Sequence, residues 1–214
     1  MQELIELFKQ SIDPEYIIRV GGLTLVTAVV FAETGLMVGF FLPGDSLLFT
    51  VGLFCALGIL PVPVGWVLLS LVLAAIIGDQ VGYWTGRFLG QKLFQKQDSR
   101  FFKRKYLDQT RAFYNRWGGS AIILGRFVPI VRTFAPILAG AVQFSPRTFI
   151  LYNISGGLLW VLSLVLSGYG LGSAFPELKK YVELIALGIV LVSILPLLRT
   201  WWRERQRIRK AAQV

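Results

Sequence analysis

Apolar stretches long enough to cross a lipid bilayer dominate this chain, and blocks of positive charge flank them. A membrane-spanning helix needs about 20 apolar residues, and six zones approach or reach that length: 20–42, 46–60, 64–86, 120–142, 149–170 and 182–198. With 55% hydrophobic and only 16% charged residues, the composition does not suit the surface of a soluble protein. We therefore predict an all-α integral membrane protein with a single membrane domain.

The basic residues are concentrated in two blocks, 87–119 with nine Lys or Arg and two acids, and 199–214 with six and one. Positive blocks beside apolar segments are typical of cytoplasmic flanks, so we reject nucleic-acid binding as the reason for the net charge of +10. If both blocks are cytoplasmic, an even number of crossings separates them, and 149–170 and 182–198 supply two. The zone 120–142 must then enter and leave the membrane on the cytoplasmic side.

Two zones combine apolar sequence with prolines and charges. Zone 20–42 contains Glu33, ends at Pro43-Gly44-Asp45 and is followed by a short apolar run to residue 60, whereas 120–142 contains Arg126, Pro129, Arg132 and Pro136. Broken backbone at membrane depth is tolerated only inside protein or beside a water-filled cavity. We therefore predict helical hairpins at 20–60, either re-entrant or two full spans, and at 120–142, with tips at Pro43, Gly44, Pro129 and Pro136.

Two short motifs recur with the same offset of 86 residues. Gly39-Phe40-Phe41-Leu42-Pro43 is echoed from Gly125 to Pro129, and Gly82-Tyr83-Trp84-Thr85-Gly86 is echoed from Gly168 to Gly172. The shared offset predicts an internal duplication, with repeats at about 20–90 and 120–172. Each repeat holds a hairpin and one transmembrane helix, 64–86 or 149–170. A single crossing per repeat inverts the second copy, so that the two tips meet near the midplane, as in secondary transporters.

The polar segments are predicted to lie on the membrane surface. Phe102, Tyr106, Phe113 and Trp117 fall on one face of a helix within the cytoplasmic segment 91–119, between basic residues suited to lipid headgroups. A solvated loop is the alternative. Leu4, Phe8 and Ile12 suggest a smaller interfacial helix near the N-terminus. Beyond the transmembrane helix 182–198, the basic tail 199–214 is expected to bind anionic lipids of the cytoplasmic leaflet. Residues 143–148 are also expected in the cytoplasm, and 1–19 and 171–181 outside.

Several enzymatic chemistries are excluded by composition. The chain has no histidine, so a Ser-His-Asp triad, a His-ligated zinc or haem and a His nucleophile are unavailable. Cys55 is the only cysteine and has no partner for an intrachain disulfide. We expect a protein that is not an enzyme and holds no metal or cofactor.

The broken zones and the glycine motifs together resemble the DedA family, whose shared region is called the VTT or SNARE-associated domain. The resemblance rests on motifs between about residues 30 and 172: Glu33, the Phe-Leu-Pro-Gly-Asp run at 41–45, Gly78-Asp79 through Gly82-Tyr83-x-x-Gly86-Arg87, Gly125-Arg126-Phe127-x-Pro129-x-x-Arg132-x-x-x-Pro136-x-x-Ala139-Gly140, and Gly156-Gly157-x-x-Trp160. The first 20 and last 35 residues carry no motif of the family.

The resemblance implies a multi-pass protein of the bacterial inner membrane that recycles the lipid carrier undecaprenyl phosphate across the bilayer. Proton-dependent transport is an older proposal for the family, and eukaryotic relatives are linked to lipid scrambling. We therefore expect a transporter of undecaprenyl phosphate or a similar lipid phosphate. A proton-dependent small-ion transporter, a general phospholipid scramblase and a non-catalytic membrane scaffold are the alternatives, the scaffold being the weakest. A homo-oligomer is compatible with the sequence.

Arg126 and Arg132 are the expected phosphate-binding residues. A cation at the bilayer centre costs about 2.5–3.5 kcal/mol on insertion scales, so it persists only with a partner or a function. The planar guanidinium matches phosphate with paired, charge-assisted hydrogen bonds. In the alternative interpretation, both arginines pair with Glu33 and Asp45 and only hold the hairpins together.

The acidic residues of the broken zones are expected to exchange protons or to form ion pairs. Glu33 lies in an apolar helix where it has no capping role. Asp45 has a second interpretation, as the N-cap of a helix that begins at Ser46. Asp79 and Arg87 are expected near the cytoplasmic end of the first crossing, with a secondary or gating role or as an interfacial ion pair. The glycines at 78, 82 and 86 are expected to permit close packing of helices.

Overall fold

The structure is a computed structural model that describes residues 14–36, 42, 44–94, 110, 112–114 and 116–181. Every element formed by these residues is a helix and none of them lies in a strand, which confirms the predicted all-α class. The principal elements, in chain order, are α2 (Pro14–Gly35), α3 (Gly44–Ala56), α4 (Val64–Phe94), α6 (Ser120–Gly125), α7 (Pro129–Ala141), α8 (Pro146–Ala174) and the 3₁₀ helix η2 (Pro176–Tyr181).

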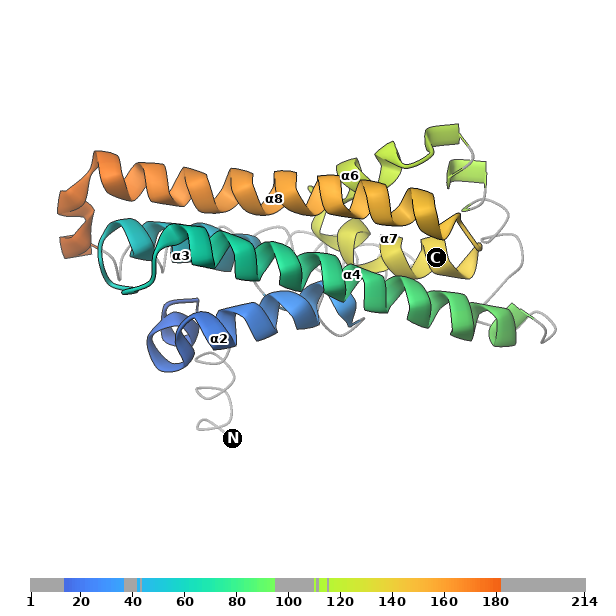
Figure 1. Cartoon of the computed structure of the whole chain (residues 1–214), viewed down its shortest axis with the longest axis horizontal. Helices are drawn as coiled ribbons and strands as arrows, with labels where there is room; N and C mark the ends of the chain where they lie inside the picture. The colour runs from blue at the N-terminus through green and yellow to red at the C-terminus, as the bar shows by residue number, and fades with distance from the viewer. Residues whose placement is uncertain are drawn as a thin grey trace, which may run out of the picture.

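Two long helices, α4 and α8, form the frame of the molecule and run antiparallel along its long axis (Figure 1). Their apolar segments Val64–Gly90 and Pro146–Ala174 are each long enough to cross a bilayer. On α4 the exposed large apolar residues recur every three or four positions, at Trp66, Leu69, Leu73 and Ile77. Such a stripe on one helix face suits contact with lipid tails. The predicted crossings 64–86 and 149–170 lie within these helices, both of which continue beyond the predicted bounds.

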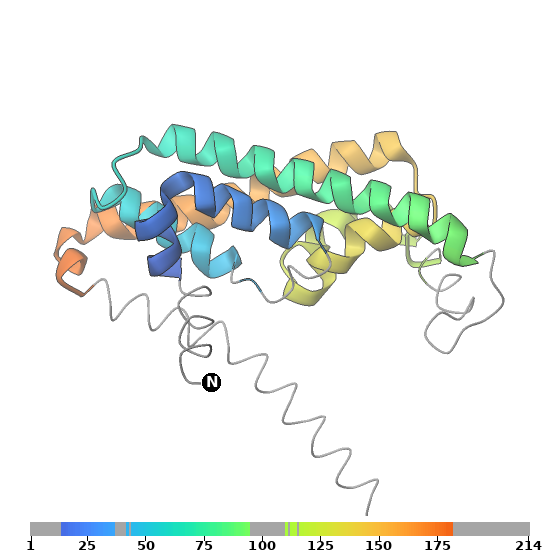
Figure 2. The ribbon, with the colours of Figure 1, turned by 90° about the horizontal axis from the view of Figure 1, so that it is seen from below.

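The short helices form two broken pairs at opposite halves of this frame (Figures 1 and 2). Helices α2 and α3 lie along one half, and α6 and α7 along the other. The second pair breaks after Gly125, and α7 begins at Pro129, where the missing proline N–H is not needed for an intrahelical bond. The predicted breaks in these two zones are therefore present. Pro136, predicted at a tip, instead lies inside α7, which continues through it.

Packing between the broken pairs and the long helices follows one pattern twice. The second helix of each pair packs along the distant long helix, α3 on α8 and α7 on α4, while the first helix packs on the nearer one in sequence, α2 on α4 and α6 on α8. Glycines allow the close approaches, because a Cβ at Gly168 would strike the Phe49 carbonyl of α3 and one at Gly140 would strike the Tyr83 carbonyl of α4. The two broken pairs and the two long helices are therefore interleaved and do not pack in the order in which they follow along the chain.

The glycines at 78, 82 and 86 bear out only part of the packing prediction. A Cβ at Gly78 would strike the Thr34 hydroxyl, and one at Gly86 would strike the Ile137 carbonyl, so both permit close contacts. At Gly82 the nearest atom would be Cβ of Pro136 at 3.5 Å, an ordinary contact.

In α2, Gly22 adopts φ 54° and kinks the helix, a conformation that residues with a Cβ rarely adopt.

The segment before α6 is held to α7 by a buried tyrosine. Tyr114 is 4% exposed and donates a hydrogen bond of 2.9 Å to the Ala135 carbonyl. Burial raises the pKa of its phenol well above the usual value, and the Asp79 carboxylate contributes in the same direction.

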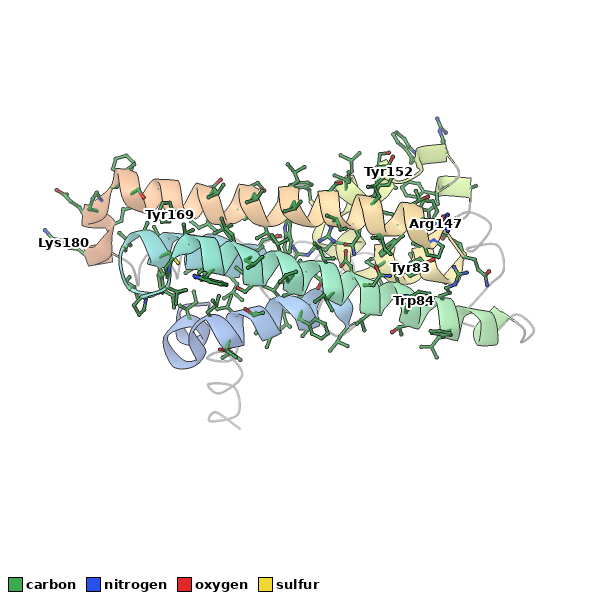
Figure 3. All side chains as sticks on the ribbon, in the orientation of Figure 1. Tyr83, Trp84, Arg147, Tyr152, Tyr169 and Lys180 are labelled. Carbon is green, nitrogen blue, oxygen red and sulfur yellow. The ribbon has the colours of Figure 1, made fainter. Side chains whose placement is uncertain are left out.

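At the two ends of the molecule, Arg147 lies near the start of α8 and Lys180 just beyond its end (Figure 3). The predicted N-terminal helix, the crossing 182–198, the tail 199–214 and most of 91–119 lie outside the described residues.

Candidate functional site

Arg132 of α7 lies between two carboxylates from the other broken pair. Its Nη2 donates to Oε1 of Glu33 on α2, and its Nη1 donates to Oδ1 of Asp45 on α3. The side chains of Arg132 and Glu33 are 7% and 1% exposed, whereas that of Asp45 is 43% exposed. Residues separated by 87 and 99 positions therefore meet, as the alternative interpretation predicted for this arginine.

Trp160 of α8 completes this cluster. Its indole Nε1 donates a hydrogen bond of 2.8 Å to Asp45 Oδ1, the same oxygen that accepts from Arg132. The Arg132 Cζ lies 4.9 Å from the centroid of the Trp160 ring, within the range of a cation–π interaction. We call Glu33, Asp45, Arg132 and Trp160 the Arg132 cluster. It joins α2, α3, α7 and α8.

Arg126 belongs to a second cluster, which corrects the prediction that it pairs with Glu33 or Asp45. Its Nη2 contacts Asp79 Oδ2 of α4 and Asn153 Oδ1 of α8. The Asn153 amide in turn donates to the Ile76 carbonyl at 3.0 Å. Arg126, Asp79 and Asn153, which we call the Arg126 cluster, are 3%, 3% and 0% exposed. The arginine lies at the break after α6, which turns its side chain toward the long helices instead of toward α2 and α3.

Asp79 lies within the apolar segment Val64–Gly90 of α4, where it is enclosed by protein and paired with Arg126. Arg87, expected beside it, lies two turns further along α4. Its Nη1 donates to the Tyr83 hydroxyl at 2.9 Å, its Cζ lies 5.9 Å from the Trp84 ring, and Tyr83 donates to the Phe144 carbonyl. Figure 3 shows Tyr83 and Trp84 in the half of the molecule where α8 begins. Arg87 and Asp79 form no interfacial ion pair.

The N-cap interpretation of Asp45 is also wrong, because α3 begins at Gly44 and Asp45 lies within its first turn. A carboxylate there still interacts favourably with the positive end of the helix dipole. The preceding Gly44 is required by close approach, since a Cβ at this position would overlap the Glu33 carboxylate. Pro43 lies outside the described residues.

Three buried polar atoms of these clusters have no hydrogen-bond partner within the described part of the chain: Glu33 Oε2, Arg126 Nε and Arg132 Nε. Buried polar groups usually have hydrogen-bond partners. Here both sides of the Arg132–Glu33 ion pair keep an unused group, the acceptor Glu33 Oε2 and the donor Arg132 Nε. The two clusters contain two guanidinium groups and three carboxyl groups. With all of them ionised, their net charge is −1.

Asn153 and Trp160 are site residues to which sequence reasoning gave no role. Trp160 appeared in a glycine motif, but nothing in the sequence connected it with Asp45. A signal for Asn153 was present, because it is a lone amide in an otherwise apolar span, and polar side chains at that depth usually face the interior. Its partners could not be identified from the sequence, since 27 residues separate it from Arg126 and 77 from Ile76.

Comparison with known proteins places these clusters in a family context. Residues 42–170 match the VTT domain, a region that includes Asp45, Asp79, Arg126, Arg132 and Trp160 but not Glu33. No solved structure shows significant similarity to the chain.

Similar proteins cover most of the chain. Protein DedA of Escherichia coli (strain K12) is 45% identical over 185 residues, which cover 86% of this chain and 84% of that protein. An uncharacterised membrane protein of Mycobacterium tuberculosis (strain ATCC 25618 / H37Rv) is 40% identical over 219 residues, covering 100% and 96%. Inner membrane protein YqjA of E. coli (strain K12) is 35% identical over 166 residues, covering 78% and 74%. Given the extent of the VTT domain and the identity to these proteins, the chain belongs to the DedA family of membrane proteins.

Proposed function

We propose that this protein is a membrane transporter, not an enzyme, that moves undecaprenyl phosphate or a similar lipid phosphate between the leaflets of the bilayer. The observation that carries the proposal is the unequal burial around Arg132: the guanidinium is 7% exposed, while its partner Asp45 is 43% exposed. A phosphate that replaces the Asp45 carboxylate finds a donor already in place. The polyprenyl tail remains in lipid throughout.

The chemistry of the guanidinium group suits this role. Arginine stays protonated inside proteins and presents several N–H donors in one plane, which match the oxygens of a phosphate. Arg132 Nε has no partner among the described residues and adds a further donor beside the two that bind the carboxylates. The Arg126 guanidinium is enclosed by Asp79 and Asn153 and supports the break between α6 and α7. Because it belongs to the Arg126 cluster, it can act on a bound phosphate only from there.

The repeated packing pattern supports an inverted repeat with two re-entrant hairpins. In each predicted repeat, the first hairpin helix packs on the long helix of its own repeat and the second on that of the other repeat. A twofold axis through the two breaks produces such a pattern. In secondary transporters a substrate site lies near the midplane, where the repeats meet. Arg132 and Asp45 come from opposite hairpins, so they would separate or approach as one repeat moves against the other.

Charge balance supports coupling to protons. The two clusters already carry a net charge of −1 with all carboxyl groups ionised, so an incoming phosphate would meet like charge in a medium of low dielectric constant. Protonation of Glu33 or Asp45 removes that repulsion. We therefore expect Glu33→Gln and Asp45→Asn to flatten the pH dependence of transport, because amides keep the shape but do not titrate. An unchanged pH profile in the double variant would exclude proton exchange by these residues.

The proposed orientation is that of a multi-pass inner-membrane protein with a cytoplasmic C-terminus. Residues 91–119, 143–148 and 199–214 would then face the cytoplasm, where the basic segments bind anionic lipids. Single cysteines at 115 and 205 in a Cys55→Ala background, probed with an impermeant maleimide in intact cells, test this orientation. Labelling of only one of them would contradict the re-entrant second hairpin.

The decisive experiment is leaflet-resolved transport of labelled undecaprenyl phosphate by the purified protein in liposomes. Arg132→Gln should abolish transport, whereas Arg147→Gln, which removes an exposed arginine outside both clusters, should not. A proton-dependent small-ion transporter would move ions without polyprenyl lipid, and a general scramblase would move neutral phospholipids equally well. A scaffold would transport nothing and would tolerate both substitutions.

A further inference from the structure

One face of α8 contacts both clusters, and the transport proposal leaves its tryptophan without a role. Asn153, Gly156, Gly157 and Trp160 are spaced three, one and three residues apart, which places them on one side of a helix. All four are buried. We call these four residues the α8 face.

The first half of the α8 face encloses Arg126. Asn153 accepts from its guanidinium, and a Cβ at Gly156 would lie 3.0 Å from the Arg126 Cδ, so a larger residue there would force the arginine side chain to shift. Asp79 binds the same guanidinium nitrogen, so Arg126 is held by α4 and α8 together. This half of the face has a positioning role.

The second half differs, because Trp160 is held by an acceptor that can leave. Its indole N–H and the Arg132 Nη1 both donate to the same oxygen, Asp45 Oδ1. Trp160 is 1% exposed and Arg132 is 7% exposed, whereas the Asp45 side chain is 43% exposed. Of the three groups, only the carboxylate has room to move outward. Its departure leaves two buried donors that converge on one point.

Two buried donors without an acceptor are costly, and an anionic oxygen at that point satisfies both. The Trp160 ring also keeps the guanidinium in place by the cation–π contact while the carboxylate is away.

We propose that Trp160 is an anion-binding residue: after Asp45 is displaced, its indole N–H and the Arg132 guanidinium donate to the same phosphate oxygen of the ligand. The ligand class is a phosphate group, borne either by a lipid or by a free phosphate ion. The lipid source rests on the proposed transport function, but the role of Trp160 does not.

The direct test uses ¹⁹F NMR of the full chain in detergent micelles, labelled with 5-fluorotryptophan. The chain has six tryptophans, and the Trp160 resonance is identified as the one lost in Trp160→Phe. Should that variant not fold, Asp45→Asn identifies it instead, because this change alters the acceptor of the indole N–H. Farnesyl phosphate and inorganic phosphate are the probes, and farnesol is the uncharged control. We expect a saturable shift of the Trp160 resonance with a phosphate probe and none with farnesol.

Binding affinity provides the second measurement. Trp160→Phe keeps a ring over Arg132 but removes the N–H, so we expect binding of farnesyl phosphate to weaken about tenfold, the effect of one hydrogen bond to a charged group. Trp160→Leu also removes the ring and should weaken binding further. The matched control is Trp66→Phe on α4, where the residue is 65% exposed and belongs to neither cluster; it should bind as the unchanged protein does.

The outcomes separate this inference from the transport proposal. A Trp160 shift with inorganic phosphate but no binding of farnesyl phosphate would support the anion-binding role and contradict the lipid substrate. Binding of farnesyl phosphate without a Trp160 shift, and with equal affinity in Trp160→Phe, would overturn the role of Trp160 and leave the transport proposal standing. If neither probe shifts the resonance, the role of Trp160 is likewise overturned.

Discussion

Removal of the buried negative charge from the Arg126 cluster should destabilise the fold far more than the same change in the Arg132 cluster. Asp79 is 3% exposed and is the only carboxylate that the described residues place on Arg126. Loss of one partner of a buried ion pair typically costs 3–5 kcal/mol. We expect about 3 kcal/mol for Asp79→Asn, because the new amide oxygen and Asn153 still accept hydrogen bonds from the guanidinium.

Asp45→Asn is the matched substitution. Arg132 keeps Glu33, and the Asp45 side chain is 43% exposed, so the loss approaches that of an exposed ion pair, about 1 kcal/mol or less. The two variants make the same chemical change but should differ by about 2 kcal/mol in the free energy of unfolding.

The assay is reversible unfolding in mixed micelles with increasing sodium dodecyl sulfate, followed by circular dichroism. The double variant Arg126→Met with Asp79→Leu removes both charges and should recover most of the stability, since a buried ion pair can be replaced by apolar groups at little cost. Equal losses for Asp79→Asn and Asp45→Asn would refute the reasoning. So would a double variant that is as unstable as Asp79→Asn.

Three further outcomes are expected. Arg132→Lys should lose most transport activity in the liposome assay while the protein still accumulates, because lysine keeps the charge but cannot bind two carboxylates or a phosphate with a planar fork; wild-type transport would leave this residue a structural role at most. Gly168→Leu should lower the unfolding free energy strongly, because a side chain there strikes the α3 backbone, whereas Gly170→Leu on the same helix meets nothing within 4 Å and should be tolerated; equal thermal shifts would contradict the packing argument. The raised pKa of Tyr114 means that the unfolded chain loses this proton before the folded one does, so stability should fall as pH rises above about 10, and Tyr114→Phe should reduce that slope in unfolding measured between pH 9 and 11.

The family, the helical class and the broken zones could be predicted because each depends on local sequence. Apolar runs identify membrane helices whatever their neighbours are, and proline ends a helix through its own ring and missing N–H. Pro129 marked the start of α7 correctly for this reason. Pro136 did not mark a break, because a helix can continue through proline where surrounding helices hold it in place.

The order of amino acids is enough to show which charged residues lie in apolar surroundings, and hence that five of them require partners or a function: Glu33, Asp45, Asp79, Arg126 and Arg132. The identity of those partners depends on how the helices pack in three dimensions. Arg126 and Arg132 are six residues apart, yet the break between α6 and α7 directs one toward Asp79 and the other toward Glu33 and Asp45. An ion pair across 47 or 99 residues depends on how interleaved helices approach one another. That approach is set by glycine contacts and side-chain volumes from several elements at once, which no single stretch of sequence contains.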